Sequence, residues 1–270
     1  MNENQTEHQP EQHEELTRMV EPEVIKMGAV QRVISIFAAP GELMHNIKAY
    51  PVILVPFLLS VVLGLIAIAP NLQVTEMTTQ EMSHISIERY GVDLFAELTM
   101  ADEYGETAMD AMGAFTIITL VVSAILGPLL MSFFATLGIF ILSKIFRGRA
   151  KFMQLFSVYM HAYVIVALGT IVSASIMAAT GSISEMTSLA PFIMPEGNIA
   201  TPAYIVLMSI AIFPVWATVV IFFGVKIVNE FSALKAAIIT VIYYATFVAI
   251  NVVILMITWW SMDMLMAMGV

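Results

Sequence analysis

Two polar side chains stand alone inside long apolar stretches of this sequence. His161, in FSVYMHAYVIVALG, is the one ionisable residue at such a position, and Asn251 is the other strongly polar residue well inside a stretch of this kind. At membrane depth, such groups can relay protons or bind a solute. A lone histidine near one end of a helix more often bonds to a neighbouring helix. We therefore take His161 and Asn251 as candidate intramembrane polar residues.

Other catalytic patterns are missing from the sequence. It has no H-E-x-x-H helix, no G-x-S-x-G elbow, no glycine-rich phosphate loop and no carboxylate pair inside an apolar stretch. It also has no cysteine, which excludes disulfides, cysteine nucleophiles and thiolate metal sites. We expect a protein that is not an enzyme and carries no cofactor.

Acidic residues and methionines are the remaining candidates for metal chemistry. The segment from Asn71 to Gly113 holds nine acids and one arginine, a net charge of −8, but its spacing does not match an EF-hand calcium loop. The chain has 21 methionines, including the alternating MDMLMAM near its end, and thioethers select Cu(I). Methionine is also an ordinary apolar filler of helix interfaces. We predict no metal site, and metal handling by methionine and carboxylate remains an alternative.

The composition is that of a membrane protein. Of the 270 residues, 59% are apolar and 12% are charged, about half the charged share of an ordinary soluble domain. The net charge of −10 argues against nucleic-acid binding. Five stretches have the roughly 20 apolar residues that a spanning helix needs; they run from Pro51 to Ala69, Ala114 to Ser143, Phe152 to Ala179, Tyr204 to Val225 and Ala236 to Ser261.

Several residues should shape these helices. The second stretch is long for one crossing, and Gly127 with Pro128 near its middle predicts a kink. Gly127, four residues after Ser123, also has the small-xxx-small spacing of close helix contacts. Pro214 should bend the fourth stretch, with Trp216 filling the gap or facing a neighbouring helix.

The first fifty residues form a separate unit. Residues 1–23 are rich in Glu, Gln and Asn and should be disordered. Residues 24–50 predict interfacial helices, because Met27, Val30, Ile34 and Phe37 recur at helical spacing with Arg32 away from that stripe. Such a helix lies on the membrane surface or packs on the rest of the protein.

Basic residues predict the orientation, because Lys and Arg are retained on the cytoplasmic side. With the N-terminus inside and five crossings in residues 51–262, ten basic residues are cytoplasmic and only Arg89 is external. The acidic insert 71–113 and the tail 263–270 then face outward, with Trp259 and Trp260 in the interfacial belt of the inner cell membrane. A cytoplasmic cluster offers candidate contacts to lipid headgroups: Lys144, Arg147, Arg149 and Lys151.

Three segments share motifs with a known family. They are VISIFAAPGELMHNIKAYPVILVPFLLSVV, GRAKFMQLFSVYMHAYVIVALGTIV and FPVWATVVIFFGVKIVNEFSALKAAIIT. In order and spacing they resemble the Yip-one domain family, particularly its prokaryotic branch, over about residues 30 to 260. The matching positions are a Phe/Pro pair before the first span, a G-x-x-x-F turn, and a W, G and S-x-x-KA pattern: Phe37, Pro40, Gly148, Phe152, Trp216, Gly224, Ser232 and Lys235.

The resemblance implies a non-enzymatic membrane organiser. Eukaryotic relatives act in vesicle traffic with small GTPases, and bacterial relatives are expected to be helper subunits of export machinery such as ABC-type transporters. We therefore predict a multi-pass adaptor or scaffold that contacts membrane lipids and other integral membrane proteins, as a monomer or a homo-oligomer. A small-solute or ion transporter or channel, for which His161, Asn251 and Pro128 would be tested first, is the alternative, and lipid remodelling is a further one.

Overall fold

The computed structural model describes residues 25–91, 105–183, 186–194 and 201–267. The predicted disordered arm, residues 1–23, lies outside the described residues. In the described parts the regular structure is helical, apart from one isolated bridge between Ser188 and Ala211. The helices are α2 Ala29–Ala38, α3 Pro40–Ala49, α4 Leu54–Ile66, α5 Ile68–Tyr90, α7 Gly105–Ile145, α8 Phe152–Thr180, α9 Ala190–Ile193, α10 Pro202–Ser209, α11 Ile212–Asn229 and α12 Ala233–Ala267.

Four helical segments of the described chain are long and apolar enough to cross a membrane. They are Gly113–Ile145, Phe152–Thr180, Ile212–Asn229 and Ala233–Ser261. A fifth crossing results if α4 and α5, which meet at 53°, are taken as one bent span. The protein is therefore an all-α, multi-pass membrane protein, as the composition predicts.

The first predicted span differs most from the expectation. Helix α4 alone has 13 residues, fewer than a crossing needs. The chain then turns at Ala67, and α5 continues as a helix of 23 residues. Pro70 contributes to the break, because it has no N–H to donate to the carbonyl of Ile66. The segment predicted as an external loop from Asn71 to Gly113 is thus helical up to Tyr90 and again from Gly105.

The fourth predicted span, Tyr204 to Val225, is divided into two helices. Helix α10 ends at Ser209 and α11 begins at Ile212. At this break, Leu189 N donates to Ile210 O at 3.1 Å and Ile212 N donates to Thr187 O at 3.0 Å. Pro214 lies in the first turn of α11, where a missing N–H is tolerated. The expected bend in mid-span is therefore a break upstream of this proline.

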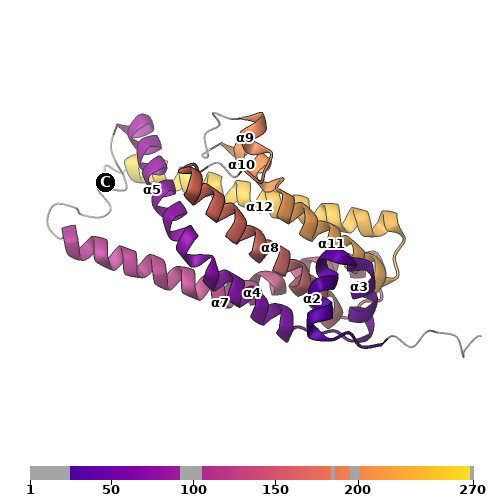
Figure 1. Ribbon diagram of the computed structural model, residues 1–270. Coiled ribbons are helices and arrows are strands. Elements are labelled where there is room, and N and C mark those ends of the chain that lie inside the picture. Colours follow the sequence, from indigo (N-terminus) through magenta and orange to yellow (C-terminus); the bar gives the residue numbers. More distant parts are fainter. Residues whose placement is uncertain (1–24, 92–104, 184–185, 195–200, 268–270) are drawn as a thin grey trace, which may run out of the picture.

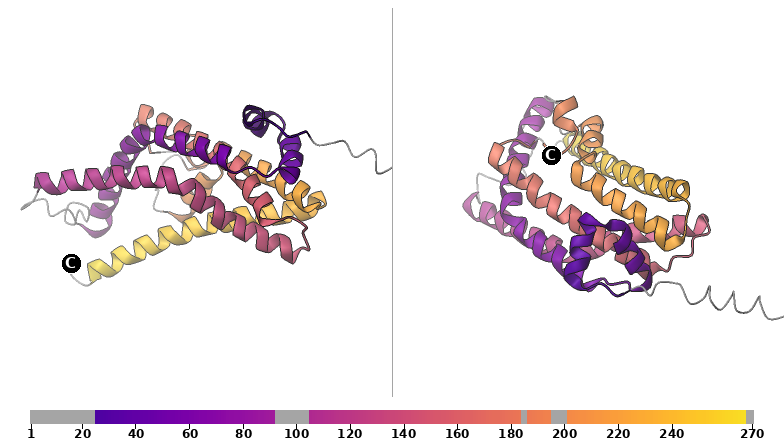
Figure 2. Two further views of the ribbon diagram at one scale, coloured as in Figure 1. Left: turned by 90° about the horizontal axis from the view of Figure 1, so that it is seen from below. Right: turned by 45° about the vertical axis from the view of Figure 1, so that its right-hand side comes forward.

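Helix α8 is the central helix of the bundle. It packs against α4, α5, α7 and α11, and the α2–α3 pair covers one end of α8 and α11 (Figures 1 and 2). Helix α7 continues unbroken through Pro128. The ends of α5 and α12 meet at the other end of the bundle, where Arg89 pairs with Asp263. Ion pairs between described residues therefore form at both ends of the bundle.

Apolar and polar side chains are distributed as in a protein surrounded by lipid. Large apolar residues point outward along α7 and α12, for example Phe134 at 65% and Val241 at 65% exposure. Hydroxyl side chains lie between the helices, and those of Tyr159 on α8 and Tyr243 on α12 are 2.8 Å apart. Lipid tails are as apolar as leucine, so close packing and polar contacts hold such helices together.

Candidate functional site

The three segments that carry the family motifs meet at one end of the bundle. We call this region, residues 25–50, 144–151 and 226–235, the basic end. Apart from Arg89, all the cationic residues that the structure describes lie here: Lys26, Arg32, Lys48, Lys144, Arg147, Arg149, Lys151, Lys226 and Lys235. Helix α3 bonds to the first turn of α8 and to the α11–α12 turn, and Arg149 of the α7–α8 turn bonds to the α11–α12 turn.

Arg32 is buried and holds α2 against α3. Its residue exposure is 2%. The guanidinium donates to Met27 O at 3.2 Å, to Tyr50 O at 3.1 Å and to Asn46 Oδ1 at 2.6 Å. Asn46 donates in turn to Ile25 O at 2.7 Å. Burial lowers the pKa of Arg32 from its ordinary value. Arg32 and Asn46 therefore hold α2 against α3. The spacing of residues in the sequence did not predict this role for either of them.

The opposite face of α2 carries the predicted apolar stripe and is exposed. Val30, Ile34 and Phe37 are 73%, 59% and 40% exposed, whereas Ile36 on the inner face is fully buried. Helices of water-soluble proteins turn their apolar stripe inward. Helix α2 instead buries an arginine and presents apolar side chains outward, as an interfacial helix does.

Glu230 joins three parts of the basic end. It occupies the left-handed position after α11, with a φ of 59°. Its carboxylate accepts from Lys48 Nζ at 2.7 Å and from Arg149 Nη1 at 2.6 Å. These two hydrogen bonds, the one from Lys48 first, lower the pKa of Glu230 below its ordinary value. Exposed pairs add little stability, so their main effect is to fix the relative positions of α3 and the two turns.

Gly148 and Asn229 form the tight contact between the two turns. Added to Gly148, a Cβ would lie 2.2 Å from Asn229 Oδ1 and 2.9 Å from Ser143 O, so a larger residue does not fit. Asn229 accepts from Ala150 N at 3.2 Å and donates to Ser143 Oγ at 3.3 Å and Val225 O at 3.0 Å. The glycine of the G-x-x-x-F turn thus makes room for an asparagine that sequence analysis did not single out.

The other motif residues pack around the same contact. Phe152 stacks on Phe156 with ring centroids 5.9 Å apart. Gly224 faces α8, where a Cβ would lie 2.2 Å from Val158 Cγ1. Ser232 accepts from Lys235 N at 3.4 Å at the start of α12. Pro40 is the first residue of α3, a favoured position for proline. Trp216, in contrast, is 37% exposed on α11, away from this region.

The four candidate headgroup residues fall into two pairs. Lys144 Nζ donates to Gly148 O at 3.2 Å and to Ala150 O at 2.9 Å, and Arg149 pairs with Glu230. Arg147 and Lys151 are exposed and make no ion pair within the described residues. Only the second pair is free of protein contacts that would compete with a headgroup or an acidic partner.

The predicted intramembrane polar residues are not brought together by a hydrogen bond. On α8, His161 is 1% exposed and its Nδ1 lies 2.7 Å from Ser157 O, while Nε2 has no partner in the described chain. Asn251 donates to Phe247 O of its own helix, α12, at 2.8 Å. A Cβ added to Gly127 would meet no described atom within 4 Å, so the expected close helix contact there is not formed. Gly169 makes such a contact instead, against Phe213.

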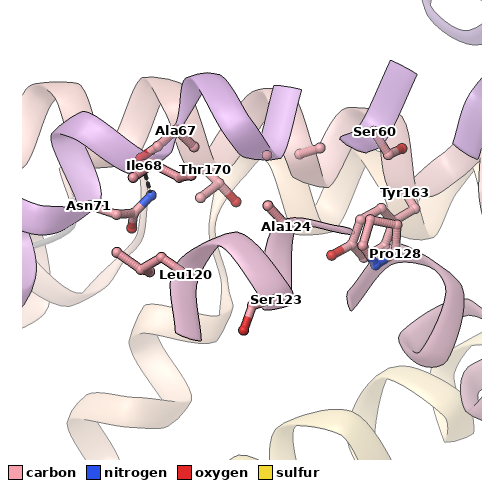
Figure 3. Close-up of a pocket in the computed structure, with 12 residues that line it drawn as sticks. Ser60, Ala67, Ile68, Asn71, Leu120, Ser123, Ala124, Pro128, Tyr163 and Thr170 are labelled. Atoms are coloured by element: carbon pink, nitrogen blue, oxygen red, sulfur yellow. Dashed lines mark hydrogen bonds between the residues drawn. The ribbon is translucent and has the colours of Figure 1, made fainter. Parts of the chain in front are cut away.

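A polar cavity of about 200 Å³ lies between α4, α5, α7 and α8 (Figure 3). Asn71 donates to Ala67 O at the break between α4 and α5, at 2.7 Å. Ser60 is fully buried and its Oγ has no partner among the described groups. Pro128 also lines the cavity and leaves the carbonyl of Ala124 without its usual helical donor. None of the described residues that line this cavity is charged.

The described residues contain no group of three or more His, Asp or Glu side chains able to hold a metal ion. Many of the acids and methionines considered for the alternative of metal handling fall outside the described side chains. Outside the described side chains lie Asp93, Glu97, Asp102, Glu103, Glu106, Asp110, Met100, Met109, Met112, Met262, Met266 and Met268. The absence of a metal site therefore stays a prediction for these positions.

Comparison with known proteins identifies the family. No curated protein and no solved structure is significantly similar to this chain. The sequence model of the Yip1 domain, however, matches residues 34–257, which include the basic-end motifs and all the helices from α3 to α11. Because this match covers most of the chain, the protein belongs to the Yip1 domain family.

Proposed function

We propose that this protein is a non-enzymatic membrane adaptor whose basic end docks on another integral membrane protein. The observation that carries the proposal is the construction of that end. Three segments distant in sequence are fixed to one another through Glu230 and Asn229. The Glu230 pairs are exposed, but the Asn229 contacts are buried and hold the two turns together, so this surface is preorganised and should bind with less loss of conformational entropy.

Charge and shape both suit a partner at the membrane surface. Arg147 and Lys151 are exposed cations, and the apolar side chains of α2, at the same end of the bundle, are exposed as well. Basic side chains next to an apolar helix face bind the headgroup region of a bilayer and an acidic protein surface within it. A subunit of an export complex, such as an ABC-type transporter, is a partner of this kind, and a second copy of the chain is another.

The orientation follows from the same charges. We place the basic end in the cytoplasm and the end with Arg89 and Asp263 outside the inner cell membrane, because basic residues are retained inside. The chain contains no cysteine, so single cysteines can be labelled without background. In intact cells, a membrane-impermeant maleimide should label Ser261→Cys and spare Arg147→Cys until the membrane is opened. The reverse pattern would contradict the orientation.

The adaptor function is tested by purification in mild detergent and mass spectrometry of the proteins that stay bound. We expect a stoichiometric membrane companion, lost when Arg147→Glu and Lys151→Glu are combined. As a control, Gln73→Glu with Gln80→Glu adds negative charge to α5 and should retain the companion. Purification of the intact wild-type protein without any companion, from cells that express it at its natural level, would refute the proposal.

The polar cavity favours a second candidate, transport of a small uncharged solute. Polar groups line it beside a broken helix, an arrangement that transporters use at membrane depth. Proteoliposomes should then admit a solute such as glycerol or urea, and Ser60→Leu, which fills the cavity, should stop the flux. Flux equal to that of empty liposomes would remove this candidate, and the adaptor proposal predicts that result.

A further inference from the structure

Helices α5 and α12 form a second polar cluster at the end of the bundle opposite the basic end (Figure 1). Arg89 Nη2 lies 3.3 Å from Asp263 Oδ2, and the hydroxyl of Tyr90 bonds to Asp263 Oδ1. The guanidinium lies over the Trp259 ring, 5.2 Å from its centroid. A cavity of about 240 Å³ opens here, lined by Arg89, Asp263, Trp259, Trp260 and Pro202, with apolar Leu255 and Met256.

Two residues that line this cavity have hydrogen-bond donors with unused capacity. Arg89 has five N–H groups, its side chain is 47% exposed, and its one ion pair in the described chain is with Asp263. Trp259 is 6% exposed, and its Nε1 has no hydrogen-bond partner among the described residues. An unpaired buried N–H costs about 1–3 kcal/mol. Both donors suit the oxygens of a phosphate group.

The cavity also contains an acceptor of opposite charge. The Asp263 side chain is 46% exposed, and each of its carboxylate oxygens has further lone pairs beyond its contact with Arg89 or Tyr90. Trp260 beside it is 64% exposed and offers an aromatic face to a cation. A ligand with both a phosphate and an ammonium group would use all of these side chains.

The residues around the cavity favour one class of phosphate ligand, a lipid without net negative charge. Leu255 and Met256 belong to the membrane-spanning segment Ala233–Ser261, so the cavity joins the aqueous edge to the apolar part of the bundle. Exposed acids on α5, Glu81 and Glu88 among them, disfavour a net negative ligand. Arg89 is the sole described cation at this end.

We propose that the cavity formed by Arg89, Trp259 and Asp263 binds the headgroup of a zwitterionic phospholipid. The phosphate accepts hydrogen bonds from Arg89 and from Trp259 Nε1, and the headgroup ammonium lies at Asp263. Such a lipid bridges α5 to α12 and stabilises the bent α4–α5 pair against the bundle. This inference does not depend on the proposed adaptor function.

The test uses the full chain, delipidated in detergent, and follows its thermal unfolding as phosphatidylethanolamine is added. Phosphatidylethanolamine should raise the unfolding temperature in a saturable manner. Trp259→Phe keeps the ring and removes the N–H donor, and Arg89→Gln removes the charge. Each should need about tenfold more lipid for half of the effect, equivalent to about 1.4 kcal/mol. Lys226→Gln, a charge removed at the basic end, should leave the lipid response unchanged.

Three results would overturn the inference. Phosphatidylglycerol acting as strongly as phosphatidylethanolamine would mean a general phospholipid effect in which the headgroup ammonium is not recognised. Inorganic phosphate producing the same shift would mean a free-anion site. A lipid response unaltered in both Trp259→Phe and Arg89→Gln, measured against the lipid-free unfolding temperature of each variant, would mean that the lipid binds elsewhere.

Discussion

The contact between Gly148 and Asn229 makes a specific prediction for Gly148→Ala. The new Cβ would lie 2.2 Å from Asn229 Oδ1, 2.8 Å from Phe231 Cζ and 2.9 Å from Ser143 O. Ser143 O is backbone and cannot rotate away, so the asparagine must move. Ala150 N then loses its acceptor at 3.2 Å.

The expected loss follows from two contributions. Overpacking a tight site costs about 1–3 kcal/mol, and a buried N–H left unpaired costs about 1–3 kcal/mol more. We therefore expect Gly148→Ala to lower the free energy of unfolding by about 2–6 kcal/mol, measured by SDS titration of the protein in detergent micelles. The matched control is Gly138→Ala, also near the end of α7, where a Cβ meets no described atom within 4 Å.

A double-mutant cycle with Asn229→Ala tests whether the clash with the asparagine causes this loss of stability. Asn229→Ala removes the oxygen nearest to the new methyl group, so Gly148→Ala should cost less in that background than in the wild type. Phe231 and Ser143 O still crowd the site, so the relief is partial. Equal stability of Gly148→Ala and Gly138→Ala, or strict additivity with Asn229→Ala, would refute this account of the turn.

Three further predictions concern the basic end. Arg32→Met should lower the free energy of unfolding by about 2–4 kcal/mol, because Tyr50 O and Asn46 Oδ1 lose their charged donor. An SDS unfolding midpoint equal to that of the wild type would contradict the role of Arg32 in holding α2 against α3. The pKa of Glu230 is held below its ordinary value of 4.5. The carboxylate therefore contributes to stability above pH 4.5, and this contribution is lost as the pH falls through the lowered pKa. The difference in free energy of unfolding between the wild type and Glu230→Gln should shrink on acidification from pH 6. A spin label at Ile34→Cys should collide with oxygen dissolved in the bilayer, whereas one at Gln31→Cys should be more accessible to a water-soluble nickel complex; equal profiles would place α2 away from lipid.

The charged side chains that the structure describes lie mainly at the ends of the bundle of this membrane protein. The described helices bury hydroxyl groups between them, and their ion pairs lie at the two ends. At one end, Glu230 and Asn229 connect the turns, and at the other, Asp263 connects α5 to α12. The central helix α8 therefore lies between two polar clusters that differ in charge and in the ligand each suits.

Local properties of the sequence determine the membrane class, the position of the long helices and the sorting of basic residues. Hydropathy, helix length and the sign of side chains can be read along the chain without knowing which helices meet. The apolar stripe of α2 could be read from residue spacing for the same reason, but spacing left open whether the stripe faces outward or packs on the protein. The breaks at Ala67 and before Ile212 were not predicted, because an apolar stretch has the same hydropathy whether its helix is continuous or divided.

The tertiary structure alone decided which side chains share a site. Asn229 reaches Ala150, 79 positions away in the chain, and Lys48 reaches Glu230 across 182 positions. Arg32 is buried because α3 packs over it and offers Tyr50 O and Asn46 Oδ1 as acceptors. Such contacts depend on how helix faces pack against one another, and helix packing is set by the shapes of many side chains together. The spacing of residues along one segment does not show how the helices pack against one another.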